Sequence, residues 1–435
     1  MAITIDKRAP LHSFVYNPIW WVVQSTNTAQ DNFRFICDIY INGQTFAGAS
    51  YIRLKVPTDP VENKGVFNPN SILERYLTYD ISIAAAGAEA VKQAPNSVIQ
   101  YTLKFGEEYG PSSAVTAFPD LAVTGNHYAY NGIIDHLDYP EFIDTSGAIY
   151  LNPSTTTKRF LTNDPRKDTS PYCQVRSNEN AWLQILNDQS GNNSARAHYE
   201  FFDSTFQVLN ATVIVANNFR LLANISDRRI IVPAGYNIDD IATADIISGT
   251  LPQVSSASNI FWKVSMTDTS NVQTSEVFIF KKDSQCTVHE EVRIHFQNEH
   301  GAFDSFTFTK ANDFETEVKE RKKFSKPLGK FIASNNYMYE TEDRHDVVFY
   351  TEMKDTITLN SDWINEDVCF WLEELVTSPV VFIENATFSR QQQTIELVPV
   401  TVLDKKYIRK KRQTSKLINL QIKIQPTYNR YRQRA

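Results

Sequence analysis

The chain has 435 residues, a formal net charge of −7 and an apolar fraction of 42%. This composition excludes an intrinsically disordered chain, because disorder requires low hydrophobicity. No apolar run approaches the ~18 residues of a membrane-spanning helix, and the first residues lack the basic-then-apolar order of a secretory signal. With only 14 glycines, glycine-rich phosphate loops are largely excluded.

The first part of the chain predicts an N-terminal β domain over residues 1–150. It begins with an apolar run, 14–23, which contains Trp20 and Trp21 and must be covered by its own domain or by another subunit. Alternating apolar residues predict strands over 33–41, 51–56 and 99–105, with an Asn42-Gly43 hairpin turn after the first. A capping box from Ser71 to Glu74 predicts a short helix, and a second helix is predicted over 127–138.

Two further regions follow. Residues 151–255 predict an irregular middle segment or inserted domain, and 256–435 predict a C-terminal β-rich domain with a basic end. Alternation predicts its strands at 260–266, 277–281, 292–296, 306–308, 347–350, 356–359, 380–383, 395–402 and 420–424. An amphipathic helix is predicted over 362–376, capped by Ser361 or Asp362 and ended by Pro379. The predicted fold class is therefore mainly β, with tandem antiparallel β-sandwich or β-barrel-like domains and a few short helices.

The four cysteines are far apart and form no Cys-x-x-Cys pair, which predicts reduced core residues rather than a zinc or redox motif. They are Cys37, Cys173, Cys286 and Cys369.

Charge is distributed unevenly along the chain. Residues 405–435 contain eleven Lys or Arg and no acidic residue, whereas residues 1–404 carry about −18. Such a tail indicates an acidic partner, which could be a neighbouring subunit, nucleic acid or an anionic surface. The interface residues predicted from this pattern and from the apolar N-terminal run are Trp20, Trp21, Lys405, Lys406, Arg409, Lys410, Lys411, Arg412, Arg430, Arg432 and Arg434.

Motifs for catalysis are missing: the P-loop, Gly-x-Ser-x-Gly and His-Glu-x-x-His patterns do not occur. His289, His295 and His300 are the one histidine cluster, but Arg293 lies between the candidate ligands and disfavours a cation. We therefore expect no catalytic residue, no metal site and no cofactor.

Two weaker patterns leave other functions open. Paired carboxylates suited to glycoside hydrolysis lie on the predicted 362–376 helix, at Glu366, Asp367, Glu373 and Glu374, where an ordinary polar helix face explains them equally well. The aromatic side chains of Trp20, Trp21 and Tyr128 could stack on a sugar, although core positions are the commoner place for aromatics in alternating strands.

A family resemblance appears in three segments. They are Asn17-Pro18-Ile19-Trp20 with Phe33-Arg34-Phe35 and Asn68-Pro69-Asn70; residues 296–308, FQNEHGAFDSFTF; and Trp371-Leu372-Glu373-Glu374-Leu375 with Ser378-Pro379, Val398-Pro399-Val400 and Leu417-Ile418-Asn419-Leu420. Together they resemble virion structural proteins of tailed phages that infect Bacteroidota, including crAss-like phages. The middle segment, 151–255, carries no part of the resemblance.

The resemblance implies a structural component of the virion, made in the host cytoplasm: a tail, neck-ring or tail-hub subunit. Its implied partners are further copies of the chain in a ring or hub and other tail or portal-proximal proteins, with contact to packaged or passing DNA left open. No membrane insertion by this chain is expected. The alternative is a glycan- or receptor-binding tail module, and a tail-associated glycan hydrolase ranks behind it.

Overall fold

The computed structural model describes residues 3–42, 51–81, 89–144, 149–151, 157–167, 172–176, 179–187, 195–209, 212–219, 221–222, 224–249, 254–283, 289, 291–333, 335–384, 397–404, 406–407, 417–428 and 430–432. The chain is mainly β, with 47% strand and 11% helix, in several antiparallel sheets and a few short helices, as the sequence predicts. None of the described sheets closes into a barrel.

Two compact units make up the chain. Unit 1 contains residues 1–284 and 297–304, and unit 2 contains residues 285–296 and 305–435. The boundaries predicted near 150 and 255 stay predictions, but unit 1 does contain two separate hydrophobic cores.

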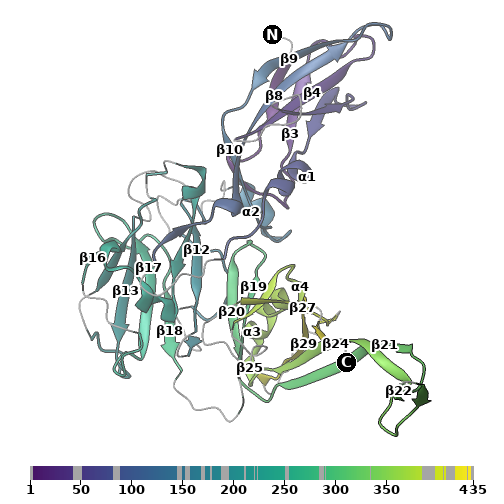
Figure 1. The fold of residues 1–435 in the computed structure, drawn as a ribbon. Helices are drawn as coiled ribbons and strands as arrows, with labels where there is room; N and C mark the ends of the chain where they lie inside the picture. Colours follow the sequence, from purple (N-terminus) through teal and green to yellow (C-terminus); the bar gives the residue numbers. More distant parts are fainter. Residues whose placement is uncertain are drawn as a thin grey trace. The chain divides into compact units, whose positions relative to one another are not determined.

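The first core of unit 1 lies between two sheets (Figure 1). Phe35, Cys37 and Ile39 alternate along one strand and are fully buried, because every second side chain of a strand faces the core. The three-stranded sheet has the order β1 (Ile3–Lys7), β3 (Trp21–Ser25), β6 (Lys64–Phe67). The other has the order β2 (His12–Phe14), β10 (His127–Tyr130), β8 (Val98–Tyr109), β4 (Arg34–Ile41), β5 (Ile52–Val56), with β9 (Thr116–Val123) also paired to β8.

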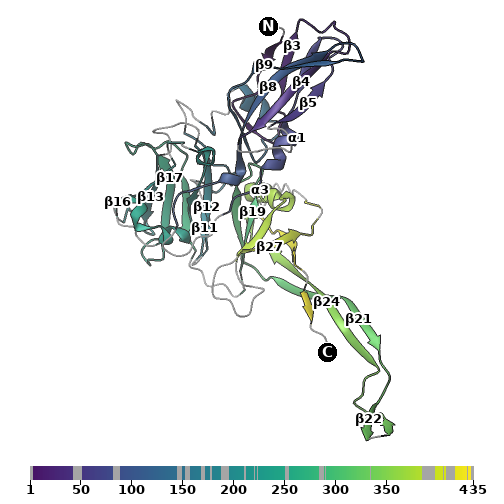
Figure 2. The same cartoon turned by 45° about the horizontal axis from the view of Figure 1, so that its top comes forward.

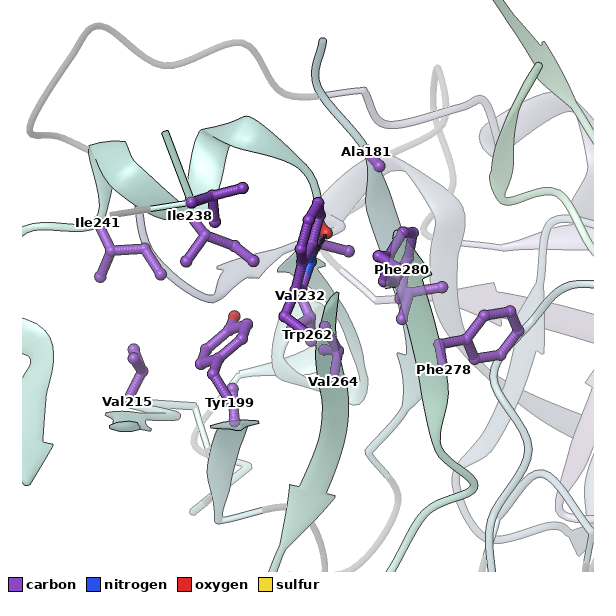
Figure 3. Packing of buried hydrophobic residues seen from close by; sticks show 14 of the residues in the cluster. Ala181, Tyr199, Val215, Val232, Ile238, Ile241, Trp262, Val264, Phe278 and Phe280 are labelled. Atoms are coloured by element: carbon purple, nitrogen blue, oxygen red, sulfur yellow. Dashed lines mark hydrogen bonds between the residues drawn. The ribbon is translucent and has the colours of Figure 1, made fainter. Parts of the chain in front are cut away.

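The second core of unit 1 is also a sandwich. Tyr199 and Val215 point across it toward Ile238 and Ile241, and the buried indole of Trp262 donates to the carbonyl of Ala234 over 2.8 Å (Figure 3). The large sheet has the order β11 (Cys173–Val175), β18 (Phe278–Lys282), β17 (Phe261–Thr267), β13 (Arg196–Phe202), β14 (Val213–Ala216), β16 (Ile246–Ser248). The small sheet has the order β12 (Trp182–Leu186), β15 (Arg229–Pro233), β7 (Lys92–Gln93).

Unit 2 is built on one sheet, whose core face is covered by two short helices. Val368 and Trp371 of α3 (Glu366–Trp371) and Leu375 of α4 (Glu373–Thr377) pack on the core residues Ile357 and Leu359. The sheet has the order β20 (Phe303–Phe308), β19 (Val292–Gln297), β26 (Val381–Glu384), β27 (Leu397–Val402), β29 (Gln421–Pro426), β24 (Asp346–Asn360), β21 (Asp313–Ser325), with β30 (Arg430–Arg432) also paired to β24. Two small pairs complete it: β22 (Lys330–Ala333) with β23 (Asn336–Met338), and β25 (Ile364–Asn365) with β28 (Leu417–Ile418).

The predicted helices needed three corrections. The 127–138 helix is wrong, because residues 127–130 form β10, which pairs with β8 and β2, and the helix α2 (Tyr139–Asp144) begins only afterwards. The 362–376 helix begins later and is split into α3 and α4, because residues 364–365 pair with β28 as a strand. Its cap is Asn365, whose side chain accepts from the Val368 amide.

The capping box at Ser71 is also wrong. The helix α1 (Asn70–Leu73) begins after Pro69, so Ser71 lies inside it, and the side chain of Asn70 accepts from the Ser71 amide at 2.7 Å. The remaining turns are the 3₁₀ segments η1 (Glu74–Tyr76), η2 (Pro95–Ser97), η3 (Ile225–Arg228), η4 (Tyr236–Asp240) and η5 (Thr243–Asp245).

Most predicted strands are confirmed within a few residues, and two are joined. Residues 347–350 and 356–359 belong to the single long strand β24. The predicted turn glycine, Gly43, lies outside the described residues, although β4 and β5 do pair antiparallel. Cys37, Cys173 and Cys369 are buried and free, as expected, and Cys286 is among the residues left undescribed. No helix in the described part of the chain has the length and hydrophobicity needed to cross a bilayer.

The neighbours Trp20 and Trp21 provide a stability test. We expect Trp21→Ala to lower the free energy of unfolding by ~3–5 kcal/mol, because it empties a fully buried site in the first core. Trp20→Ala is the matched control and should cost about 0.5 kcal/mol or less, since its indole is exposed. Urea unfolding followed by circular dichroism measures both. Equal losses for the two variants would contradict the assigned packing.

Candidate assembly surface

The two tryptophans at the start of β3 have opposite environments. Trp21 is fully buried against Phe105 and His127, whereas Trp20 is 45% exposed. Successive residues of an extended chain point to opposite sides, so the pair could not share one role. Trp21 is therefore a core residue of unit 1, and of the two only Trp20 lies where a partner can reach it.

A surface pocket of about 300 Å³ lies beside Trp20. The ammonium of Lys7 lies 5.7 Å from the centre of the Trp20 ring, and Arg8 also lines the pocket. The complete lining is Lys7, Arg8, Ala9, Pro10, Leu11, Pro18, Trp20, Tyr139 and Ile143. An exposed ring beside two cations, with no acidic residue in the lining, suits a ring-shaped ligand with a negative charge.

Tyr128, the third aromatic proposed for stacking, is not available at the surface. It is buried in β10, and the guanidinium of Arg228 lies 3.6 Å from its ring centre.

The basic C-terminal residues fall into two groups. Lys405, Arg409, Lys410, Lys411, Arg412 and Arg434 lie outside the described residues. Lys406 is described and exposed, and Arg430 and Arg432 lie in β30, opposite Met353 and Thr351 of β24. The predicted strand at 420–424 is confirmed as β29, which pairs with the base of β24. Two described strands of the basic end, β29 and β30, therefore belong to the sheet of unit 2.

The most prominent surface of unit 2 is one that the sequence did not predict. β21 and β24 form a long antiparallel ribbon, which extends away from the rest of its own sheet and ends in the β22–β23 pair (Figure 2). We call residues 313–356 the arm. All 13 residues of β21 are exposed. Its sequence, DFETEVKERKKFS, gave no clear signal because eight of its 13 residues are charged and only three are apolar.

Large apolar side chains are concentrated on the arm. Nine of them are exposed between Phe314 and Phe349, and Phe331 at the tip is the most accessible, at 72%. They are Phe314, Val318, Phe324, Leu328, Phe331, Tyr337, Met338, Tyr339 and Phe349. Single exposed apolar residues are normal on proteins, but a concentration of them marks an interaction surface.

The histidines predicted as a weak cluster do not converge. His289 is exposed ahead of β19, His295 is buried in unit 2 and His300 is buried in unit 1. Within the residues that the structure describes, no group of three His, Cys, Asp or Glu could bind a metal ion.

His295 takes part in a buried polar network of unit 2. Its Nδ1 lies 2.6 Å from the Ser305 hydroxyl, and its Nε2 lies 2.9 Å from Glu384, which also forms an ion pair with Arg293 at 3.2 Å. A serine, a histidine and a carboxylate in contact resemble a nucleophile relay. Here, however, the arginine also pairs with the carboxylate and the imidazole is fully buried, so the network joins β19, β20 and β26 rather than facing a substrate.

A second buried network stabilises unit 1 around Arg229, whose side chain is fully buried. Its guanidinium donates to the Gln184 side chain at 2.8 Å, to the Asn131 carbonyl at 3.0 Å and to the His300 carbonyl at 3.3 Å. Burial and the nearby Arg229 lower the pKa of His300 to about 3, so this imidazole is neutral. Gly301 has a φ of +73° and lies so close to the Asn131 carbonyl that a Cβ would clash with it.

The paired carboxylates of the helix face lie at two helix starts. Glu366 and Asp367 are in the first turn of α3, and Glu373 and Glu374 are in the first turn of α4. Acidic residues favour these positions because the helix dipole is positive there. Their suggested role in hydrolysis stays a prediction.

Comparison with known proteins adds no identification. No model of a protein family matches the chain, and no curated protein is similar to it in sequence.

Acid sensitivity follows from the buried histidines of unit 1. Burial first, then Arg228, lowers the pKa of His12 to about 3, and His300 has the same value. In the unfolded chain both titrate near ~6.5, so the unfolded state binds more protons as the pH falls below that value. We expect the free energy of unfolding to fall by up to ~1.4 kcal/mol per pH unit for each histidine between about pH 6.5 and pH 5.

Urea unfolding at pH 7.5, 6.5, 5.5 and 5 measures this dependence. In the variant His300→Gln, the free energy of unfolding should change less steeply with pH, by the contribution of about one proton. The control is His136→Gln, a change at an exposed position. Identical slopes for the wild-type chain and His300→Gln would show that the pKa of His300 is the same in the folded and unfolded states.

Proposed function

We propose that this chain is a structural subunit of a tailed-phage virion, located in the tail, neck ring or tail hub, where it assembles with further copies and with neighbouring virion proteins. The observation that carries the proposal is the arm, an exposed β-ribbon with nine exposed large apolar side chains. The resemblance of the sequence to virion proteins of Bacteroidota phages supports the location.

The arm supports an assembly role for a physical reason. An isolated two-stranded ribbon is at best marginally stable in water, so one this long gains stability when another surface covers it. Subunits of rings commonly use heterologous contacts, in which one surface meets a different surface on the neighbour. A projecting arm suits such a contact, because it reaches beyond the unit that carries it.

Particle labelling tests the virion location. We expect mass spectrometry of purified, intact phage particles to detect the chain at a stoichiometry of several copies, and immunogold electron microscopy to place it at the neck or tail. Pre-immune serum is the control. A chain that is abundant in the infected cell but absent from intact particles would overturn the proposal.

A second candidate function, glycan or receptor binding, is favoured by the pocket beside Trp20. Lys7 and Arg8 in its lining favour an acidic sugar. We expect glucuronic acid to give saturation-transfer NMR signals with the full chain, and glucose to give none. Trp20→Ala should remove the signal, while Trp363→Ala, a change at another exposed tryptophan, should keep it. Equal signals for both sugars, or no signal for either, would contradict this function.

A further inference from the structure

We propose that the arm of one copy docks on an acidic, apolar loop in unit 1 of a second copy, residues 133–141. This inference rests on the proposed assembly role and names the surfaces that carry it. The argument uses the face of the arm, the charge around that face and the matching properties of the loop.

One face of the arm continues the core face of unit 2. Leu359 and Ile357 of β24 are fully buried under the helices, and the alternate residues farther along the strand, Asp355, Met353 and Thr351, face the same way. The partner of Ile357 in β21 is Phe314, which is 48% exposed, and the partner of Met353 is Val318, which is 39% exposed. This face therefore leaves the core and continues into solvent, with Phe314 and Val318 exposed on either side of the polar pair Thr316 and Asp355.

Positive charge surrounds the same face. Arg321 is the partner of Thr351 on one side, and Arg432 of β30 is its partner on the other. We define the outer arm as residues 318–326, 346–353 and 430–432. It contains seven basic and three acidic residues, a formal charge of +4, whereas the tip of the arm, residues 327–345, has two basic and three acidic residues. Its docking partner should therefore present apolar side chains among carboxylates.

Unit 1 has a surface of that kind. Residues 105–157 include seven acidic residues and no Lys or Arg. Within them, the segment 133–141, a loop that ends in the first turn of α2, exposes Asp135, Asp138 and Glu141 beside Leu137, which is 85% exposed. Burial raises the pKa of Glu299, a hydrogen bond with Asn163 lowers it, and the nearby Asp135 and Asp138 raise it further.

Charge complementarity favours a second copy as the occupant. Unit 1 carries 30 acidic and 21 basic residues, a formal charge of −9, so every copy offers both the basic outer arm and an acidic surface for the next copy's arm. The contact joins two different surfaces, so it is heterologous. Such contacts close into a ring when a whole number of copies, each rotated by the same angle relative to the one before, completes a full turn.

A charge-swap experiment tests the proposal. The arm variant is Arg321→Glu with Lys323→Glu, and the loop variant is Asp138→Lys with Glu141→Lys; all four side chains are exposed. Native mass spectrometry and sedimentation at low and moderate salt measure the oligomer. We expect the wild-type chain to form a discrete multimer that weakens as salt rises. Each variant alone should associate on the order of 100-fold more weakly, because like charges then face each other.

Mixing the two variants provides the decisive readout. The acidic arm of one variant then meets the basic loop of the other, and the unchanged surfaces also match. The mixture should therefore restore multimers that contain both chains. Matched controls place the same charge changes elsewhere on exposed residues: Lys310→Glu with Lys423→Glu, and Asp31→Lys with Glu62→Lys. Both controls should assemble as the wild-type chain does, and circular dichroism confirms that each variant folds.

Several results would overturn the proposal. If the arm variant still forms multimers, the arm is not part of the contact between copies. If the loop variant still forms multimers but the arm variant does not, the arm docks somewhere other than this loop. Two variants that stay monomeric when mixed exclude a direct charge match. A wild-type chain that is monomeric at every salt concentration excludes docking between copies, while particle labelling separately decides the proposed virion location.

Discussion

The need to cover apolar sheet faces is the constraint on which this structure depends. In unit 1 each of two sandwiches covers its own inner faces, so Trp21 and Trp262 are fully buried without a partner chain. In unit 2, α3 and α4 cover the sheet only at its base. The arm carries the same face outward, where Phe314 and Val318 are exposed. Because water does not stabilise such a face, covering the arm is favourable, which supports the proposed assembly role.

Some buried polar side chains in this protein are of the types found in catalytic sites, but here they connect strands of the fold. Ser305, His295 and Glu384 are in contact, yet Arg293 also pairs with the carboxylate and the imidazole is inaccessible. Arg229 is buried because two backbone carbonyls and an amide side chain accept its hydrogen bonds. Such groups are costly to bury unless they are paired, so these pairings explain why the cores of a mainly β protein can contain them.

The uneven distribution of charge along the chain acts together with the need to cover apolar sheet faces. β30, which contains Arg430 and Arg432, pairs with β24 of the arm, while the longest stretch without Lys or Arg belongs to unit 1. Apolar area supplies most of the free energy of a protein interface, and charge mainly selects the partner and speeds the encounter. The proposed contact uses both, since Phe314 and Val318 face one way with Arg321 beside them. The pocket at Trp20 is a smaller surface of similar composition.

The sequence by itself determined the local features of this protein. Alternation identified strands such as residues 34–41, and the three described cysteines are buried as expected, because strand period and side-chain hydrophobicity are local properties. The tertiary structure decided the rest. Residues 127–130 became a strand because β2 and β8 pair with them, and Trp20 and Trp21 were separated by the side of the sheet each faces. β21 had no visible alternation and is a strand because it pairs along nearly the whole of β24, a contact between distant residues that no local pattern encodes.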